Sequence, residues 1–119
     1  MRNLLTICKA LSDPNRVRAL LLLSKGELCV CQLRAVLGLA TSTVSAHVAV
    51  LRRAGLVRAR RQGRWMHYSI DPQASPVARQ AMEWVFLQAA GDRQIKRDRA
   101  RLVRVLRMDK EELCVRLRS

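Results

Sequence analysis

The chain has 119 residues, half of them hydrophobic, so it fits one compact domain that can bury a core. With one Phe, one Tyr and two Trp, that core must be built from Leu, Val and Ala, a composition that favours helices. A net charge of +14 predicts an anionic partner, either nucleic acid or a membrane surface, and argues against cationic substrates. No apolar stretch approaches the ~20 residues of a membrane span, and the N-terminus does not resemble a secretory signal.

The spacing of apolar residues predicts four helices before residue 56. Asp13 is a suitable cap for the second helix, with Pro14 at its first position. Gly26 follows the second helix, and Gly38 and Gly55 end the other two. The expected ranges are 4–11, 14–24, 29–37 and, starting at Thr41 or Ser42, 41–54.

The pattern then changes to alternation, which predicts a β-hairpin over residues 56–70 with Gln62-Gly63 as its turn. A helix is expected again over 75–90, and Gly91-Asp92 ends it. Asp109 and Glu112 form a capping-box pattern for a last short helix. The expected fold is mostly helical with a small β-hairpin: a domain over 1–91 for DNA binding and dimerisation, followed by a basic helical tail over 92–119.

Two short helices joined by residues 38–40 and followed by a basic hairpin are typical of a winged helix-turn-helix. The second helix of the pair would enter the major groove, where short polar side chains reach bases or phosphates, and hairpin arginines would hold phosphate. The alternatives are a merely solvated arginine face and a packed or capping role for His47. The candidate DNA-binding residues are Thr41, Ser42, Thr43, Ser45, His47, Arg52, Arg60, Arg61 and Arg64.

Cys29 and Cys31 form a second candidate site, because thiolates bind soft ions. Residues i and i+2 point to nearly opposite sides of an α-helix but to the same side of an extended segment. Binding one ion through both sulfurs therefore favours an unwound start of the third helix, which would couple the ion to loss of DNA affinity. We expect free thiols here, in a cytoplasmic protein. The alternative is that both cysteines are small buried hydrophobes.

Five segments of the chain resemble the ArsR/SmtB-type winged-helix repressors over about residues 4–72. The element ELCVC resembles the arsenic-sensing branch of that family. The resemblance implies a homodimer, joined through helices 4–11 and 77–90, on a palindromic operator. It also implies release of double-stranded DNA when As(III) or Sb(III) binds as inducer, with no catalytic cofactor. The segments are ALSDPNRVR (10–18), ELCVCQL (27–33), TVSAH (43–47), LRRAGLV (51–57) and GRWMHY (63–68).

The chain departs from the arsenic-sensing pattern at Arg34, where that pattern has a third cysteine. Cys114 is one candidate for the missing ligand, from either protomer, although it can also simply pack. Cys8 is a weaker candidate, because its place on the first helix favours packing in the dimer interface. A small cellular thiol or two-coordinate binding is the third option. The His and Asp ligands of the family's zinc sensors are not expected, since no histidine follows His67.

Two other functions compete with a metalloid-responsive repressor. One is a thiol-based redox sensor that uses the same cysteines. The other is a non-specific DNA-binding protein with structural cysteines, whose affinity would fall with salt equally for all sequences. An enzyme is not expected, because the sequence holds no Ser/His/Asp set, phosphate-binding loop or paired carboxylates. A membrane partner is not expected either.

Overall fold

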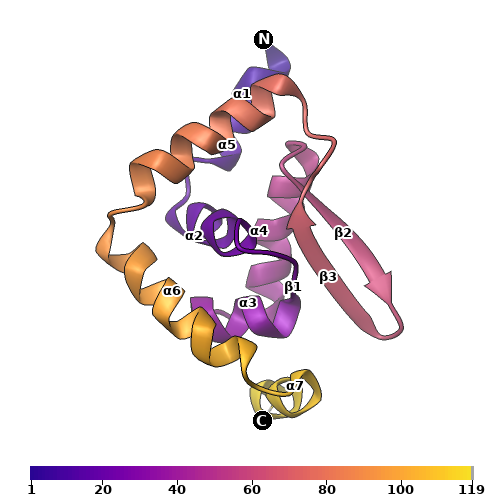
Figure 1. The fold of residues 1–119 in the computed structure, drawn as a ribbon. Coiled ribbons are helices and arrows are strands. Elements are labelled where there is room, and N and C mark those ends of the chain that lie inside the picture. The colour runs from indigo at the N-terminus through magenta and orange to yellow at the C-terminus, as the bar shows by residue number, and fades with distance from the viewer. Residues whose placement is uncertain (119) are drawn as a thin grey trace.

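Residues 1–118, which the computed structural model describes, form seven helices and a three-stranded antiparallel sheet (Figure 1). This is the mostly helical architecture with a small wing that the sequence predicts, and the predicted helical tail consists of two helices. The elements are α1 (Arg2–Ala10), α2 (Pro14–Leu23), β1 (Leu28–Cys29), α3 (Val30–Leu37), α4 (Thr41–Arg53), β2 (Val57–Gln62), β3 (Trp65–Ile70), α5 (Pro76–Ala89), α6 (Arg93–Leu106) and α7 (Lys110–Arg118).

The helix boundaries follow local capping chemistry. The Asp13 carboxylate accepts hydrogen bonds from the backbone amides of Asn15 and Arg16, at 2.8 and 3.2 Å, and Pro14 opens α2. Ser75 accepts from the amide of Ala78 in the same way at the start of α5. Gly38 ends α3 with a φ of 71°, a left-handed conformation that side chains other than glycine disfavour. The capping residues that sequence analysis selected, Asp13 and Gly38, therefore fix the start of α2 and the end of α3, and the structure adds the Ser75 cap of α5.

The sheet has the strand order β1-β3-β2, and β1 is the strand that sequence analysis missed. Its two residues pair with Tyr68 and His67 of β3, so Cys29 belongs to this strand and not to the predicted third helix. The hairpin turn is also one residue further along than predicted. Gln62 pairs with Trp65, which leaves Gly63 and Arg64 as the two turn residues.

Helices α3 and α4 cross at 107°, the angle of a helix-turn-helix pair. Val44, Val48 and Leu51 lie on the buried face of α4, so the opposite face of this helix remains exposed. In the part of the chain that the structure describes, no single helix is long and apolar enough to cross a membrane. The bent pair of α3 and α4 together is long and apolar enough, but only by the criteria of length and composition.

The hydrophobic core continues into the C-terminal helices. Leu20 and Leu33 lie at its centre, and Leu102, Val105 and Leu113 from α6 and α7 belong to the same cluster. In Figure 1, α6 (orange to yellow) passes along α2 and α3, and α7 lies beside the start of α3. The predicted division at residues 91 and 92 coincides with the break between α5 and α6, and the helices beyond this break pack on the helix-turn-helix.

A buried ion pair joins α6 to α2. The Arg18 guanidinium donates to both carboxylate oxygens of Asp98 at 2.9 Å, and the Gln94 amide donates to the same carboxylate at 2.9 Å. The side chain of Asp98 is 3% exposed and that of Arg18 is 16% exposed. Since such paired, hydrogen-bonded charges tolerate burial where a single charge does not, this pair fixes the position of α6 on the domain.

An apolar surface remains uncovered on α1 and α5, which lie beside each other at the end of the molecule that carries the N-terminus (Figure 1). Leu4 and Leu5 of α1 and Val77, Trp84 and Leu87 of α5 are all exposed. Large apolar side chains exposed on two neighbouring helices are typical of interaction surfaces. The sequence prediction that these two helices form a dimer interface is consistent with this surface.

Candidate DNA interface and thiol site

The exposed face of α4 begins with the polar side chains that sequence analysis selected. Thr41, Ser42, Thr43 and Ser45 are all exposed along the first turns of the helix. His47 is only half-buried, and its Nδ1 lies 3.4 Å from Nη1 of Arg16. Ser42, Thr43 and Ser45 are thus placed to reach a major groove. The Thr41 hydroxyl accepts a hydrogen bond from Arg34 at 3.2 Å, and His47 lies against α2.

The wing arginines divide into two kinds. Arg60 donates to both carboxylate oxygens of Glu27, at 2.8 and 2.6 Å, and Arg64 donates to Glu111 of α7 at 2.7 Å. Arg64 also lies over the ring of Trp65, 5.5 Å from its centroid. Arg61 is exposed and forms no ion pair within residues 1–118.

An open hollow of about 490 Å³ lies between the end of α4 and β2. Arg52, Arg53 and Arg58 line it, and sequence analysis selected only the first of these as a DNA-binding residue. Three cationic side chains beside an exposed helix are suited to a phosphate backbone. Arg53 and Arg58 belong to the same basic run, which continues without an acid from Arg52 to Arg64 and which the sequence already indicates as suited to phosphate contact.

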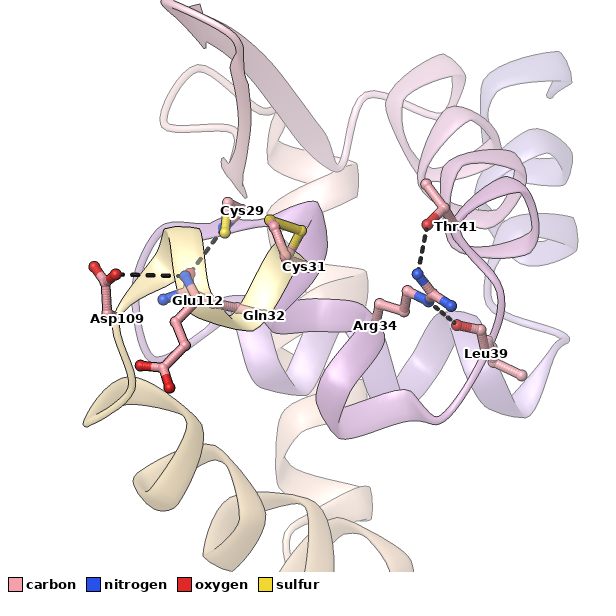
Figure 2. Close-up of a disulfide and its surroundings, with 9 residues drawn as sticks. Cys29, Cys31, Gln32, Arg34, Leu39, Thr41, Asp109 and Glu112 are labelled. Carbon is pink, nitrogen blue, oxygen red and sulfur yellow. Dashed lines mark hydrogen bonds between the residues drawn. A yellow bond between two sulfur atoms is a disulfide. The ribbon is translucent and has the colours of Figure 1, made fainter. Parts of the chain in front are cut away.

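The predicted thiol site lies where β1 passes into α3 (Figure 2). Cys29 caps the helix in an extended conformation, with φ −84° and ψ 165°, and its side chain is fully buried. Its backbone amide donates to Oε1 of Gln32 at 3.0 Å. The two-cysteine spacing predicted an unwound start of the third helix. Because Cys29 already lies outside α3 in an extended conformation, the helix does not need to unwind at this residue.

Cys31 and Cys114 are bonded to each other as a disulfide between α3 and α7, with their Cα atoms 5.5 Å apart (Figure 2). The expectation of free thiols at Cys29 and Cys31 is therefore wrong for Cys31, whereas Cys29 is free, as is Cys8. The pairing spans 83 residues of sequence and depends on α7 folding back onto α3. Local spacing carries no signal for such a contact, although Cys114 was selected as a candidate third sulfur ligand.

The structure brings two of the predicted inducer ligands together and leaves another apart. Cys8 lies exposed on α1, at the opposite end of the molecule from α7 in Figure 1. Among residues 1–118, no group of three or more His, Cys, Asp or Glu side chains is arranged to hold a metal ion. The two bonded sulfurs of Cys31 and Cys114 must be reduced before they can act as ligands together with Cys29.

His67 of β3 is buried and is the register partner of Cys29 across the sheet. Burial lowers the pKa of this imidazole below its usual value, and the nearby cation of Lys110 acts in the same direction. The Glu27 carboxylate, 3.8 Å from Nδ1, opposes this shift.

We predict that the free energy of unfolding decreases as the pH falls from 7 toward about 5. Above about pH 6.5 the imidazole is neutral in both states, and below it the unfolded chain takes up the proton first. Urea unfolding of the oxidised protein at each pH measures this slope. The His67→Gln variant should lose the slope and the His47→Gln variant should keep it. Equal slopes in all three proteins would contradict the assignment to His67.

Comparison with known proteins identifies the family. Residues 13–59 match the model of the bacterial regulatory proteins of the arsR family. The chain is 43% identical over 77 residues to the arsenic resistance transcriptional regulator ArsR1 of Pseudomonas putida, covering 61% of this chain and 60% of that relative. It is 46% identical over 65 residues to the arsenical resistance operon repressor of Escherichia coli, covering 54% and 56%. These alignments thus span less than two thirds of both relatives.

A solved structure extends the likeness from sequence to fold. It is the homodimeric winged helix-turn-helix DNA-binding domain of a possible ArsR-family transcriptional regulator from Mycobacterium bovis. The TM-score is 0.65 at 32% identity, over 75% of this chain and 80% of that one. The family and its named relatives are transcriptional regulators, not enzymes. The chain therefore belongs to the ArsR family of winged helix-turn-helix regulatory proteins.

Proposed function

We propose that this protein is a transcriptional repressor that binds a palindromic operator as a homodimer and leaves it when As(III) or Sb(III) binds. The observation that carries the proposal is the position of two cysteines at the start of α3, the helix that packs against α4: Cys29 precedes its first turn and Cys31 lies within it. Arg34 of α3 donates to the carbonyl of Leu39 and to Oγ1 of Thr41, both at 3.2 Å (Figure 2). A displacement of α3 by an inducer therefore acts on the first residue of α4.

In this proposal the inducer is bound by Cys29, Cys31 and Cys114 of one protomer. A cellular dithiol or two monothiols first reduce the Cys31–Cys114 bond, giving two protein thiols and an oxidised small thiol. Arsenous acid then exchanges its three hydroxyl groups for the three sulfurs and releases three waters, so arsenic stays trivalent. A cytoplasmic location, with its reducing thiol pools, is part of this proposal.

Operator release by arsenite tests the proposal. A palindrome selected by the protein from random DNA is labelled, and fluorescence anisotropy follows dissociation from the reduced protein as arsenite is added. Wild type and Cys8→Ser should dissociate, and the Cys29→Ser, Cys31→Ser double variant should stay bound. Dissociation of the double variant at the wild-type arsenite concentration would refute thiolate sensing at this site.

A second candidate function is a thiol-based redox response, and the Cys31–Cys114 disulfide itself favours it. Peroxide would take two electrons from the two thiols, form the disulfide and leave two waters. If this is the signal, peroxide alone changes operator affinity and the Cys114→Ser variant does not respond. If metalloid is the signal, the oxidised and reduced proteins bind the operator alike until arsenite is added.

The free and paired wing arginines give a separate prediction for DNA binding. Arg61→Gln should lower the slope of log affinity against log salt by about 1.8, because the dimer loses one phosphate contact in each protomer, at about 0.9 per contact. Arg64→Gln should change this slope less, since Glu111 already neutralises that charge. Anisotropy titrations over a range of salt concentrations measure both. Equal changes of slope in the two variants would contradict the division into free and paired arginines. Equal affinity for all DNA sequences would instead favour a non-specific DNA-binding protein.

A further inference from the structure

A hollow of about 250 Å³ opens beside the disulfide, between the start of α3, the wing and α7. Both disulfide cysteines line it, and so do Trp65 and Met66 of β3. An indole ring and a thioether beside two sulfur atoms form a surface that suits an apolar or aromatic group. This hollow thus combines soft ligand atoms with apolar walls, which three-thiolate binding of a bare ion does not require.

The third cysteine is not among the residues that line this hollow. Cys29 is fully buried between β1 and α3, whereas Cys31 and Cys114 are reached from the hollow. A ligand that enters here therefore meets two sulfurs before it meets a third. Trivalent arsenic that already carries one organic group has two exchangeable positions left, so two thiolates complete its coordination.

We propose that this hollow binds a monosubstituted trivalent organoarsenical through Cys31 and Cys114, with the organic group lying against Trp65 and Met66. The inference rests on the proposed function, because it assigns these cysteines to an inducer. After two monothiols or a dithiol reduce the disulfide, the two thiols replace two hydroxyl groups of R–As(OH)₂. Two As–S bonds form, two waters leave, and arsenic stays trivalent. Cys29 takes no part in this step.

The rim of the hollow connects the ligand to the wing. The ion pair between Arg64 and Glu111 joins the hairpin turn to α7, and both side chains line the same hollow. An organic group in the hollow lies against this ion pair and displaces it as the group becomes larger. The organic group thus affects the wing through the ion pair at the hairpin turn. The bonds from sulfur to arsenic affect α4 through α3.

Binding of phenylarsine oxide and arsenite to the reduced full-length protein tests the proposal without DNA. Native mass spectrometry gives the stoichiometry, and fluorescence of Trp65 in a Trp84→Phe background gives the affinity. The Cys29→Ser variant should keep the phenylarsine oxide affinity of wild type and lose at least about tenfold in arsenite affinity. The Cys31→Ser and Cys114→Ser variants should each lose both ligands. Equal loss of both ligands in Cys29→Ser would overturn the two-sulfur site.

The apolar wall has its own test. Met66→Ala should weaken phenylarsine oxide more than methylarsonous acid, because only the phenyl group reaches across the hollow. An unchanged ratio of the two affinities would overturn the placement of the organic group. Failure of arsenite to release operator DNA would refute the proposed function and leave these binding results standing. Loss of phenylarsine oxide binding in Cys29→Ser would refute the further inference alone.

Discussion

Replacing Trp84 and Leu87 by arginine is expected to convert the protein into a monomer and to lower its operator affinity by about 100-fold or more. These side chains are 63% and 76% exposed on α5, the helix that contacts α1, where Leu4 and Leu5 are also exposed. Arginine at both positions would place charges in the centre of the contact between two copies. Because each chain has one helix α4, only a dimer can bind both half-sites of a palindrome.

Sedimentation velocity measures the oligomeric state, and anisotropy on the selected palindrome measures the affinity. The matched control is the Val103→Arg, Leu106→Arg double variant on α6, whose two side chains are 52% exposed each. It adds the same charge to a similarly apolar surface outside α1 and α5, so it should remain a dimer. A Trp84→Arg, Leu87→Arg protein that still sediments as a dimer would exclude this interface.

Removing the carboxylate of Asp98 is expected to lower the free energy of unfolding more than breaking any of the exposed ion pairs, because its ion pair with Arg18 is mostly buried. Asp98→Ala leaves the Arg18 guanidinium without its two 2.9 Å acceptors in a mostly buried place. Breaking such a pair costs about 3–5 kcal/mol, and the partial exposure of Arg18 favours the lower end. Urea unfolding of the disulfide-bonded protein measures the free energy of unfolding.

A double variant separates loss of charge pairing from loss of packing. Arg18→Met combined with Asp98→Leu removes both charges and keeps comparable side-chain volume, so it should recover most of the lost stability. Asp92→Ala, which removes only the N-terminal cap of α6, should cost about 1 kcal/mol. If Asp98→Ala costs no more than Asp92→Ala, the ion pair does not hold α6 in place.

The sequence predicts those parts of the fold that depend on neighbouring residues. Asp13-Pro14 starts α2 and Gly38 ends α3, because capping and left-handed backbone conformations are determined locally. The strand β1 escaped prediction, since two residues have no periodicity and their pairing partners lie in β3. The hairpin turn shifted by one residue because the cross-strand register, and not the dipeptide at the turn, sets its position.

The candidate site shows the same difference between features set by neighbouring residues and features set by distant ones. Helical periodicity and composition placed Ser42 and Thr43 on an exposed face of α4, and the family resemblance drew attention to Cys29 and Cys31. What could not be predicted are contacts made by segments distant in sequence. Glu111 of α7 reaches the wing, and the sulfur of Cys114 reaches α3, only after α6 has crossed the domain. Residue types alone showed which groups can react, but not which of them meet.

Arg34 occupies the position where the arsenic-sensing pattern has its third cysteine, and its hydrogen bonds to Leu39 and Thr41 have a consequence for how a signal travels. In the proposed function, a cysteine at this position would bind the inducer, whereas Arg34 connects α3 to the first residue of α4. The third sulfur would then come from Cys114 of α7. Under this proposal, inducer binding and its transmission to α4 depend on different residues, so a substitution can alter one without the other.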